Sequence, residues 1–338
     1  MKIQMKANGL IIKIYNYLIS RSFLNKRNRI CRRIRAMLYH NICFFCHAQF
    51  GRLNPERVFY VIRSPKSELG FFGLYNYVVD CLKDAQRLGA DPVVDWQYYP
   101  NDYLLEDHLV GRVNAWEFFF EPVSGISLKE VYHSQNVIMS DGRYDGTLSE
   151  VRNEEELLKS RNVIAKYIVL NEQTKQLFNN EYKRLRMADY QVLGVKCRGT
   201  DFREARPQGH VICPDVEYTV RVIEEKEKEW GRTFDKIFIA TEDENMFQEM
   251  KKVYGERLLY NDTLRFETSN GKWLNQLFDR VDDNSDYKYK RMLEYLISVY
   301  LLASCDAFIS PVVGAALGAM RIKGQYEHFQ LIHLGNYS

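Results

Sequence analysis

Acidic residues are absent from the first 50 positions of this chain, which hold ten Lys or Arg side chains. The remaining positions hold 37 basic and 44 acidic side chains, so a body of net charge −7 follows a segment of net charge +10. This asymmetry excludes a nucleic-acid-binding protein with a uniformly basic surface. The content of 46% hydrophobic and 14% aromatic residues excludes a disordered body.

A disulfide pattern and a long hydrophobic run are also missing. The seven cysteines are odd in number and most lie in apolar segments, which is typical of reduced, buried thiols. The longest apolar run near the start, residues 9–20, contains Lys13 and is shorter than the roughly 20 residues that span a bilayer. We therefore expect a cytoplasmic protein with no membrane-spanning helix.

The basic segment, residues 1–50, mixes Ile, Leu, Phe and Tyr with its Lys and Arg. This composition suits a helical arm on the inner face of the plasma membrane, where each basic side chain contributes about 1 kcal/mol. A first helix with a solvated basic face explains the composition equally well. Binding of RNA by the arm is a third interpretation, although no nucleic-acid partner is expected for the body.

The rest of the chain alternates short apolar segments with amphipathic ones. Residues 58–62 and 92–95 predict strands on either side of a helix that Gly89 ends, which is the opening of a βαβ unit. A second series of alternating strands and helices begins near residue 191. We predict an α/β fold: after the arm, two Rossmann-like doubly wound domains, residues 51–190 and 191–338, with a ligand cleft between them.

Polar segments follow two expected strands of the second domain, at the strand ends where doubly wound sheets bind ligands. Arg198, followed by Gly199 and Thr200, suits an anion clamp, because a guanidinium binds phosphate through two hydrogen bonds. Glu242 and Asp243 suit acceptors for the donors of a base or a ribose. The alternatives are a turn with a local salt bridge at Arg198 and the N-cap and first turn of the next helix at 242–243.

A third segment, residues 311–316, leads into a small-residue helix whose first N–H groups suit a diphosphate. Tight packing of that helix on the sheet is the alternative. Glu294 lies in a helix rich in apolar residues and either has a partner or lies on an exposed stripe. The sequence contains no Gly-x-x-x-x-Gly-Lys-Ser/Thr loop, no Gly-x-Ser-x-Gly elbow and no Asp-x-Asp pair, which disfavours an ordinary kinase, an ATPase and metal-held diphosphate binding.

Three motifs in register resemble the α1,6-fucosyltransferase and protein O-fucosyltransferase superfamily. Residues 194–201, Gly-Val-Lys-Cys-Arg-Gly-Thr-Asp, resemble its Gly-Val-His-x-Arg-x-Thr-Asp motif. Residues 237–243 resemble its strand ending in Ala-Thr-Asp-Asp, and residues 302–310, followed by Gly314, resemble its diphosphate-carrying helix, strand and loop. Residues 70–95 are similar to the first βαβ unit of such enzymes.

The resemblance implies a GT-B glycosyltransferase whose first domain binds the acceptor and whose second binds GDP-fucose, with inverting transfer and no metal or cofactor. It implies that Arg198 binds the β-phosphate and that Glu242 and Asp243 hold ribose or guanine. Lys196 replaces the motif's His, and Ser298 aligns with a helical Asp that reads guanine, one turn after Glu294. The donor-site prediction comprises Lys196, Gly199, Thr200, Glu242, Asp243, Glu294, Ser298, Ser310, Gly314, Ala315 and Ala316.

Three carboxylates are candidates for the general base: Glu68, Glu121 and Asp201, each with a structural role as its alternative. The predicted catalytic set is Arg198, Asp201 and Glu68, and the predicted acceptor site comprises Gly70, Gly73, Asn76, Trp116 and Glu121. The aromatic segment around Trp116 either lines the acceptor cleft or belongs to the core.

The function expected is fucose transfer from GDP-fucose onto a glycan or lipid-linked glycan acceptor, in bacterial surface polysaccharide synthesis. A GT-B transferase with another nucleotide-sugar donor, and a non-catalytic RNA- or lipid-binding protein, are the alternatives.

Overall fold

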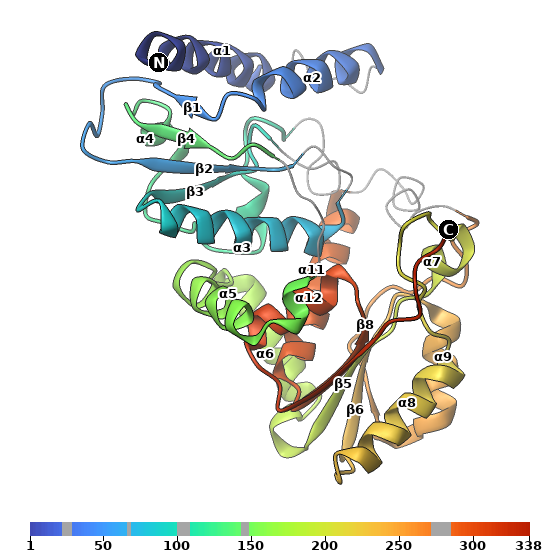
Figure 1. Ribbon diagram of the computed structural model, residues 1–338. Helices are drawn as coiled ribbons and strands as arrows, with labels where there is room; N and C mark the ends of the chain where they lie inside the picture. Colours follow the sequence, from blue (N-terminus) through green and yellow to red (C-terminus); the bar gives the residue numbers. More distant parts are fainter. Residues whose placement is uncertain (22–28, 66–68, 100–108, 143–148, 272–284) are drawn as a thin grey trace. The chain divides into compact units, whose positions relative to one another are not determined.

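The computed structural model describes residues 1–21, 29–65, 69–99, 109–142, 149–271 and 285–338 (Figure 1). Internal contacts divide the chain into two compact units. The first comprises residues 1–146 and 162–171, and the second comprises residues 147–161 and 172–338. Each unit has its own β-sheet, so the α/β prediction is confirmed.

The first unit is built on a four-stranded sheet of order β1-β4-β2-β3. Strands β2 (Phe59–Arg63), β3 (Asp91–Asp95) and β4 (Val137–Met139) are parallel, and the short β1 (His47–Ala48) pairs antiparallel with β4 at the edge. Helix α3 (Phe71–Arg87) joins β2 to β3, which confirms the predicted βαβ opening. It ends where Gly89 adopts a φ of +61°, a conformation that favours glycine.

Helices α1 (Lys2–Ser20) and α2 (Arg29–Ile42) belong to this first unit and lie on the side of its sheet away from α3 (Figure 1). Ile12, Tyr15 and Ile19 of α1 are buried. The Asn8 side chain donates a hydrogen bond of 2.8 Å to the carbonyl of His47 in β1. The basic segment that we expected as an arm is therefore packed against the sheet by its own apolar residues.

Short helical elements occupy much of the remaining first unit and the connection to the second. They are η1 (Ala115–Phe118), α4 (Leu128–Val131), η2 (Ser149–Arg152), α5 (Glu154–Tyr167), α6 (Glu172–Arg184) and η3 (Met187–Asp189). Helix α6 packs against α11 (Ser285–Ser304), with the rings of Phe178 and Tyr300 6.0 Å apart. This packing places α6 in the second unit, so the division by contacts differs from the boundary expected near residue 190.

The second unit has a five-stranded sheet in which every pairing is parallel, in the order β7-β6-β5-β8-β9. Its strands are β5 (Val192–Lys196), β6 (Lys236–Ala240), β7 (Leu258–Leu259), β8 (Ala307–Pro311) and β9 (His328–Ile332). The helical elements are α7 (Thr200–Ala205), α8 (Val216–Glu229), α9 (Glu244–Tyr254), η4 (Gly255–Arg257), α11 and α12 (Gly314–Lys323). If these five strands are numbered 1 to 5 along the chain, their order across the sheet is 3-2-1-4-5. This is the doubly wound arrangement that we predicted.

Alternation along the central strand β5 separates the two faces of this sheet. Leu193 and Val195 point into the core formed with α8 and α9. Gly194 points to the other face, where a Cβ atom would lie 3.1 Å from Cys305 Sγ, so the glycine lets α11 pack closely. Figure 1 shows α8 and α9 on one face and α11 and α12 on the other.

The strand order also creates a switch point. Strands β5 and β8 are neighbours, but the chain leaves β5 toward β6 on one side and leaves β8 toward β9 on the other. The loops after these two strands therefore diverge at their carboxyl ends, which is where doubly wound sheets bind ligands. Residues 197–200 and the start of α12 lie at this edge.

Candidate functional site

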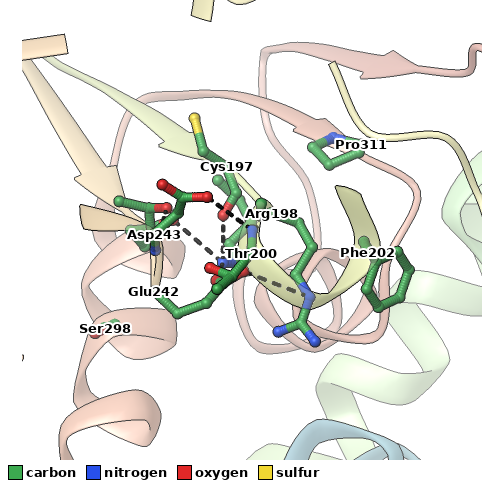
Figure 2. Close-up of polar contacts among 12 residues, drawn as sticks. Cys197, Arg198, Thr200, Phe202, Glu242, Asp243, Ser298 and Pro311 are labelled. Carbon is green, nitrogen blue, oxygen red and sulfur yellow. Dashed lines mark hydrogen bonds and ion pairs between the residues drawn. The ribbon is translucent and has the colours of Figure 1, made fainter. Parts of the chain in front are cut away.

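The loop after β5 is held in an unusual conformation by two carboxylates. The amide of Gly199 donates to Glu242 Oε1 at 3.0 Å, and the amide of Thr200 donates to Asp243 Oδ2 at 2.7 Å (Figure 2). Thr200 has a φ of +35°, which is strained for a β-branched residue. Glu242 and Asp243 follow β6, so neighbouring parallel strands bring together two segments that lie more than 40 residues apart in sequence.

Arg198 is oriented from three sides at this edge of the sheet. Its Nη2 donates to Asp201 Oδ2 at 2.8 Å, and its Nε lies 3.5 Å from Glu242 Oε1. Its Cζ lies 4.7 Å from the ring centroid of Phe202, within the range of a cation–π contact. The side chain remains 19% exposed. A guanidinium has five N–H donors, so these contacts fix its plane and leave donors for an anion.

Lys196 and Glu242 form a buried ion pair beneath Arg198. The Lys196 ammonium donates to Glu242 Oε2 at 2.9 Å and to the carbonyls of Cys197 and Ala240. Only 2% of the Lys196 side chain is exposed. Burial alone raises the pKa of Glu242, but the charges of Lys196 and Arg198 outweigh it and lower that pKa to about 2.

Neighbouring charges also keep the guanidinium of Arg198 protonated. Burial disfavours the charged guanidinium, but the neighbouring carboxylates of Glu242 and Asp201 raise the pKa of Arg198 above its ordinary value. Glu242 and Asp201 thus compensate the charges of Lys196 and Arg198, and Asp243 adds a third carboxylate to the same loop. By contrast, burial raises the pKa of the adjacent Cys197 thiol to about 12, which excludes a thiolate nucleophile at neutral pH.

The two carboxylates after β6 are engaged within the protein. Asp243 caps α9, because its Oδ1 accepts from the amide of Met246 at 2.9 Å while Oδ2 accepts from Thr200. Both oxygens of Glu242 are also in contact with the chain. These side chains therefore hold the Arg198 loop, and the expected contact of Glu242 and Asp243 with ribose or guanine stays a prediction.

A buried hydroxyl group points to a missing contact in this loop. Thr200 is buried, and within the part of the chain that the structure describes its Oγ1 has no hydrogen-bond partner. Leaving a buried polar group unpaired costs about 1–3 kcal/mol. Ser310, at the end of β8, is fully buried and its hydroxyl donates to the carbonyl of Pro311 at 2.7 Å, so it is satisfied locally.

Helix α12 begins directly after β8, at the edge of the sheet that carries Arg198. Its N-cap residue, Val313, makes no side-chain capping hydrogen bond. The first N–H groups of a helix have no partner within the helix and carry its positive dipole end. Ala315 and Ala316 follow Gly314 in this first turn, and their side chains are buried in the packing that we considered as the alternative.

Glu294 and Ser298 of α11 tie this helix to the segment after β7. Ser298 Oγ lies 3.0 Å from Asn261 Oδ1 and 2.8 Å from the carbonyl of Glu294. Glu294 Oε2 accepts from the amide of Leu264 at 3.1 Å. Glu294 therefore has the partner expected of a carboxylate in an apolar helix, and Ser298 is buried in the same network.

Sequence reasoning missed three residues that shape this site. Phe202 stacks on Arg198, and Asn261 anchors Ser298. Burial raises the pKa of Tyr295, and the charges of Lys196 and Arg198 act in the opposite direction, which places this α11 phenol beside the charged cluster. No sequence signal identified them, because Tyr295 and Asn261 come from distant segments, and Phe202 lies on α7, whereas Arg198 precedes that helix.

In the first unit, the predicted acceptor residues differ in their accessibility. Trp116 is buried, stacks on Phe120 with ring centroids 4.2 Å apart, and donates its indole N–H to the carbonyl of Glu121. Asn76 is fully buried in α3. The structure corrects these two expectations, because neither side chain presents a surface to an acceptor. Gly70, at the N-cap of α3, and Glu121 are exposed, and Gly73 is half-buried.

The three candidates for the general base differ in their surroundings. Asp201 is buried and paired with Arg198, so it positions the guanidinium. Glu121 is exposed, and Glu68 lies outside the described residues.

Within the described ranges, no cluster of three or more His, Cys, Asp or Glu side chains is arranged to hold a metal ion. None of the described helices is long and apolar enough to cross a membrane.

Comparisons with known proteins give structural similarity and no sequence match. No family model matches the chain, and no curated protein matches it. It is similar to the structure of NodZ α-1,6-fucosyltransferase soaked with GDP-fucose, with 17% identity, coverage of 79% of this chain and 92% of that chain, and a TM-score of 0.49. The structure of fucosyltransferase NodZ from Bradyrhizobium has 16% sequence identity to this chain and a TM-score of 0.47. The match covers 78% of this chain and 92% of that chain. The structure of POFUT1 in complex with GDP has 10% sequence identity to this chain and a TM-score of 0.34. The match covers 83% of this chain and 76% of that chain.

Gly199 is the position in this loop where a side chain has no space. A Cβ atom there would lie 2.2 Å from Asp243 Oδ2, the atom that holds the Thr200 amide. We expect Gly199→Ala to lower the free energy of unfolding by about 1–3 kcal/mol and donor turnover by more than tenfold. Urea unfolding and donor-hydrolysis assays measure these effects.

Gly125→Ala is the matched control, since a Cβ atom at Gly125 meets nothing within 4 Å. It should leave both quantities unchanged. A Gly199→Ala protein with the stability and turnover of the unmodified chain would show that the contact between Gly199 and Asp243 does not shape the site.

Proposed function

We propose that this protein is a glycosyltransferase of GT-B architecture that moves L-fucose from GDP-fucose to a glycan acceptor. The observation that carries the proposal is Arg198. It occupies the arginine position of a motif that resembles the fucosyltransferase motif, and it follows the central strand at the switch point of a doubly wound sheet. Its guanidinium is held by Asp201, Glu242 and Phe202 with part of its surface still exposed.

The proposed reaction is an inverting displacement at C1 of the sugar. The acceptor oxygen forms a bond to C1 from the face opposite the diphosphate, while the bond from C1 to the β-phosphate oxygen breaks. Negative charge then accumulates on the leaving GDP. Arg198 and the N-terminal amides of α12 oppose that charge, which is the task that a metal ion performs in other transferases.

Deprotonation of the acceptor requires a group other than Asp201. Asp201 is buried and already bound to Arg198, so in this proposal it acts as a positioning residue. Glu121, which is exposed, and Glu68 remain the candidates for the base. The Thr200 hydroxyl, which is buried without a partner in the described chain, is proposed to bind a phosphate oxygen of the donor.

We extend the proposal to the acceptor and the place of reaction. A glycan or lipid-linked glycan of a bacterial surface polysaccharide is the proposed acceptor, and the inner face of the plasma membrane is the proposed location. The proposed location is supported by the composition of residues 1–50, which contain ten basic side chains and no acidic one.

A transferase with another nucleotide-sugar donor is the second candidate. It is favoured by the engagement of Glu242 and Asp243 within the protein and by Ser298 at the position of the guanine-reading Asp. With these features, no carboxylate is assigned to recognise the guanine base of the donor.

A donor-hydrolysis panel tests both candidates. GDP-, UDP- and dTDP-sugars are incubated with the full chain, with and without EDTA, and release of the nucleoside diphosphate is measured. We expect GDP-fucose to be hydrolysed fastest and at a rate that EDTA leaves unchanged. A preference for a UDP- or dTDP-sugar would select the second candidate, and the absence of hydrolysis with every donor would indicate a non-catalytic binding protein.

A further inference from the structure

Helix α1 has two apolar faces, and the first unit covers only one of them. Ile12, Tyr15 and Ile19 are buried against the sheet and the segments beside it. Ile3, Leu10 and Ile14 are exposed large hydrophobic residues, with Leu10 61% and Ile14 52% accessible. A helix that only covers a sheet requires one apolar stripe, so the second one needs another explanation.

The spacing places the exposed residues together. Positions 3, 10, 14 and 17 are separated by seven, four and three residues, so they fall on one side of an α-helix. Positions 8, 12, 15 and 19, which are buried, fall on the opposite side. Tyr17 belongs to the exposed set and adds an amphipathic aromatic ring.

Helix α2 repeats the pattern. Ile30, Ile34 and Met37 are exposed at a spacing of four and three residues, with Ile30 65% and Met37 58% accessible. Phe44 is also exposed just beyond the end of this helix. We call the residues Ile3, Leu10, Ile14, Ile30, Ile34 and Met37 the outer stripe.

Basic side chains accompany the outer stripe. Lys2, Lys6 and Arg33 are exposed on the same helices, and residues 1–50 contain no acidic side chain. Lysine and arginine beside an apolar face extend toward lipid phosphates while their stems lie along the hydrocarbon boundary. Binding of RNA would use the basic groups and leave the apolar residues in water, so charge and hydrophobicity together favour a lipid surface.

We propose that α1 and α2 dock on an anionic bilayer, with the outer stripe in the boundary between headgroups and acyl chains. This deepens the proposed peripheral location, and it does not depend on the donor or on catalysis. The sequence accounts for the attraction through charge, whereas the structure adds which apolar residues enter the lipid. Because Ile12, Tyr15 and Ile19 belong to the core, point variants of the full chain test the proposal better than removal of residues 1–50.

The experiment is co-flotation of the full chain with phosphatidylcholine vesicles that contain or lack phosphatidylglycerol. We expect binding to the anionic vesicles only, weakened by salt. The Leu10→Gln/Ile14→Gln variant should partition at least about tenfold more weakly, since two apolar side chains no longer enter the lipid. Val253→Gln/Leu158→Gln, which changes two exposed apolar residues of α9 and α5, should partition like the unmodified protein.

Three outcomes would overturn the proposal. The first is a Leu10→Gln/Ile14→Gln variant that partitions normally, and the second is salt-sensitive binding to single-stranded RNA without binding to vesicles. The third is a dimer in light scattering that this variant converts to a monomer while vesicle binding is unchanged. The thermal unfolding midpoint of the variant should be unaltered, and its donor hydrolysis without vesicles should be retained. Loss of hydrolysis in every protein with normal vesicle binding would contradict only the proposed function.

Discussion

Arg198→Lys is expected to reduce kcat for donor turnover by about 100- to 1,000-fold, the loss typical of removing one preorganised group that stabilises transition-state charge. A lysine keeps the charge but loses the planar fork that reaches Asp201 and Glu242 and stacks on Phe202. The leaving diphosphate carries more negative charge in the transition state than in the bound donor, so kcat should fall more than KM rises. Steady-state release of the nucleoside diphosphate measures both constants.

Arg203→Lys is the matched control for this experiment. Arg203 lies on helix α7, which begins two residues after Arg198, and its side chain is exposed. Its replacement should leave kcat and KM unchanged. If the Arg198→Lys protein turned over the donor at the normal rate, Arg198 would not be the group that opposes the leaving-group charge.

Glu242→Gln should lower the free energy of unfolding by about 3 kcal/mol. The change removes the charge that compensates Lys196, whose side chain is only 2% exposed. Removing one partner of a buried ion pair leaves an uncompensated charge, which typically costs about 3–5 kcal/mol. Urea denaturation of the purified variant at neutral pH measures this difference.

The pH dependence of stability gives this prediction a second signature. The pKa of Glu242 falls from its ordinary value of 4.5 to about 2 in the folded chain, so the unfolded chain takes up the proton first as the solution is acidified. The stabilisation is therefore complete above pH 4.5 and is lost as the pH falls toward 2, by about 3 kcal/mol over that interval. The Glu242→Gln variant should lack this part of the acid sensitivity.

A double variant separates the charge from the shape of the site. Lys196→Met together with Glu242→Gln removes both charges and should recover much of the stability that the single change loses. Glu249→Gln, an exposed position on α9, should have no effect. A Glu242→Gln protein as stable as the unmodified chain would show that Lys196 is not held by this pair.

The strands of the second unit could be predicted from the sequence because they are encoded locally. Residues 192–196 and 236–240 are short apolar runs between polar segments, and such runs form strands wherever a sheet is available to bury them. The doubly wound order also followed from the alternation of strands and helices. The motif residues were found for a related reason, since loops after parallel strands converge on one edge of the sheet.

The roles within the site could not be predicted because they depend on which atoms meet. The segment 241–243 is compatible with a ligand site and with a helix cap, and only the position of the loop after β5 shows that Glu242 and Asp243 bind its amides. Trp116 is a similar case: an aromatic residue suits a sugar cleft or a core, and its packing on Phe120 places it in the core.

The division of the chain was also decided at the tertiary level. Nothing in the local pattern of α6 shows whether it covers the first sheet or the second, and its contact with α11 assigns it to the second unit. The same holds for α1, where the residue pattern contains two apolar faces and only packing selects Ile12, Tyr15 and Ile19 for burial.

By itself the sequence determined the α/β class, the charge asymmetry between residues 1–50 and the rest, and the positions of Arg198 and the helix start at Gly314. These features depend on neighbours along the chain, so a linear pattern contains them. The tertiary structure alone decided which carboxylates support Arg198 and which apolar face of α1 stays exposed. Hydrogen bonding and burial join residues that are distant in the sequence, and their energies depend on the three-dimensional arrangement of those residues.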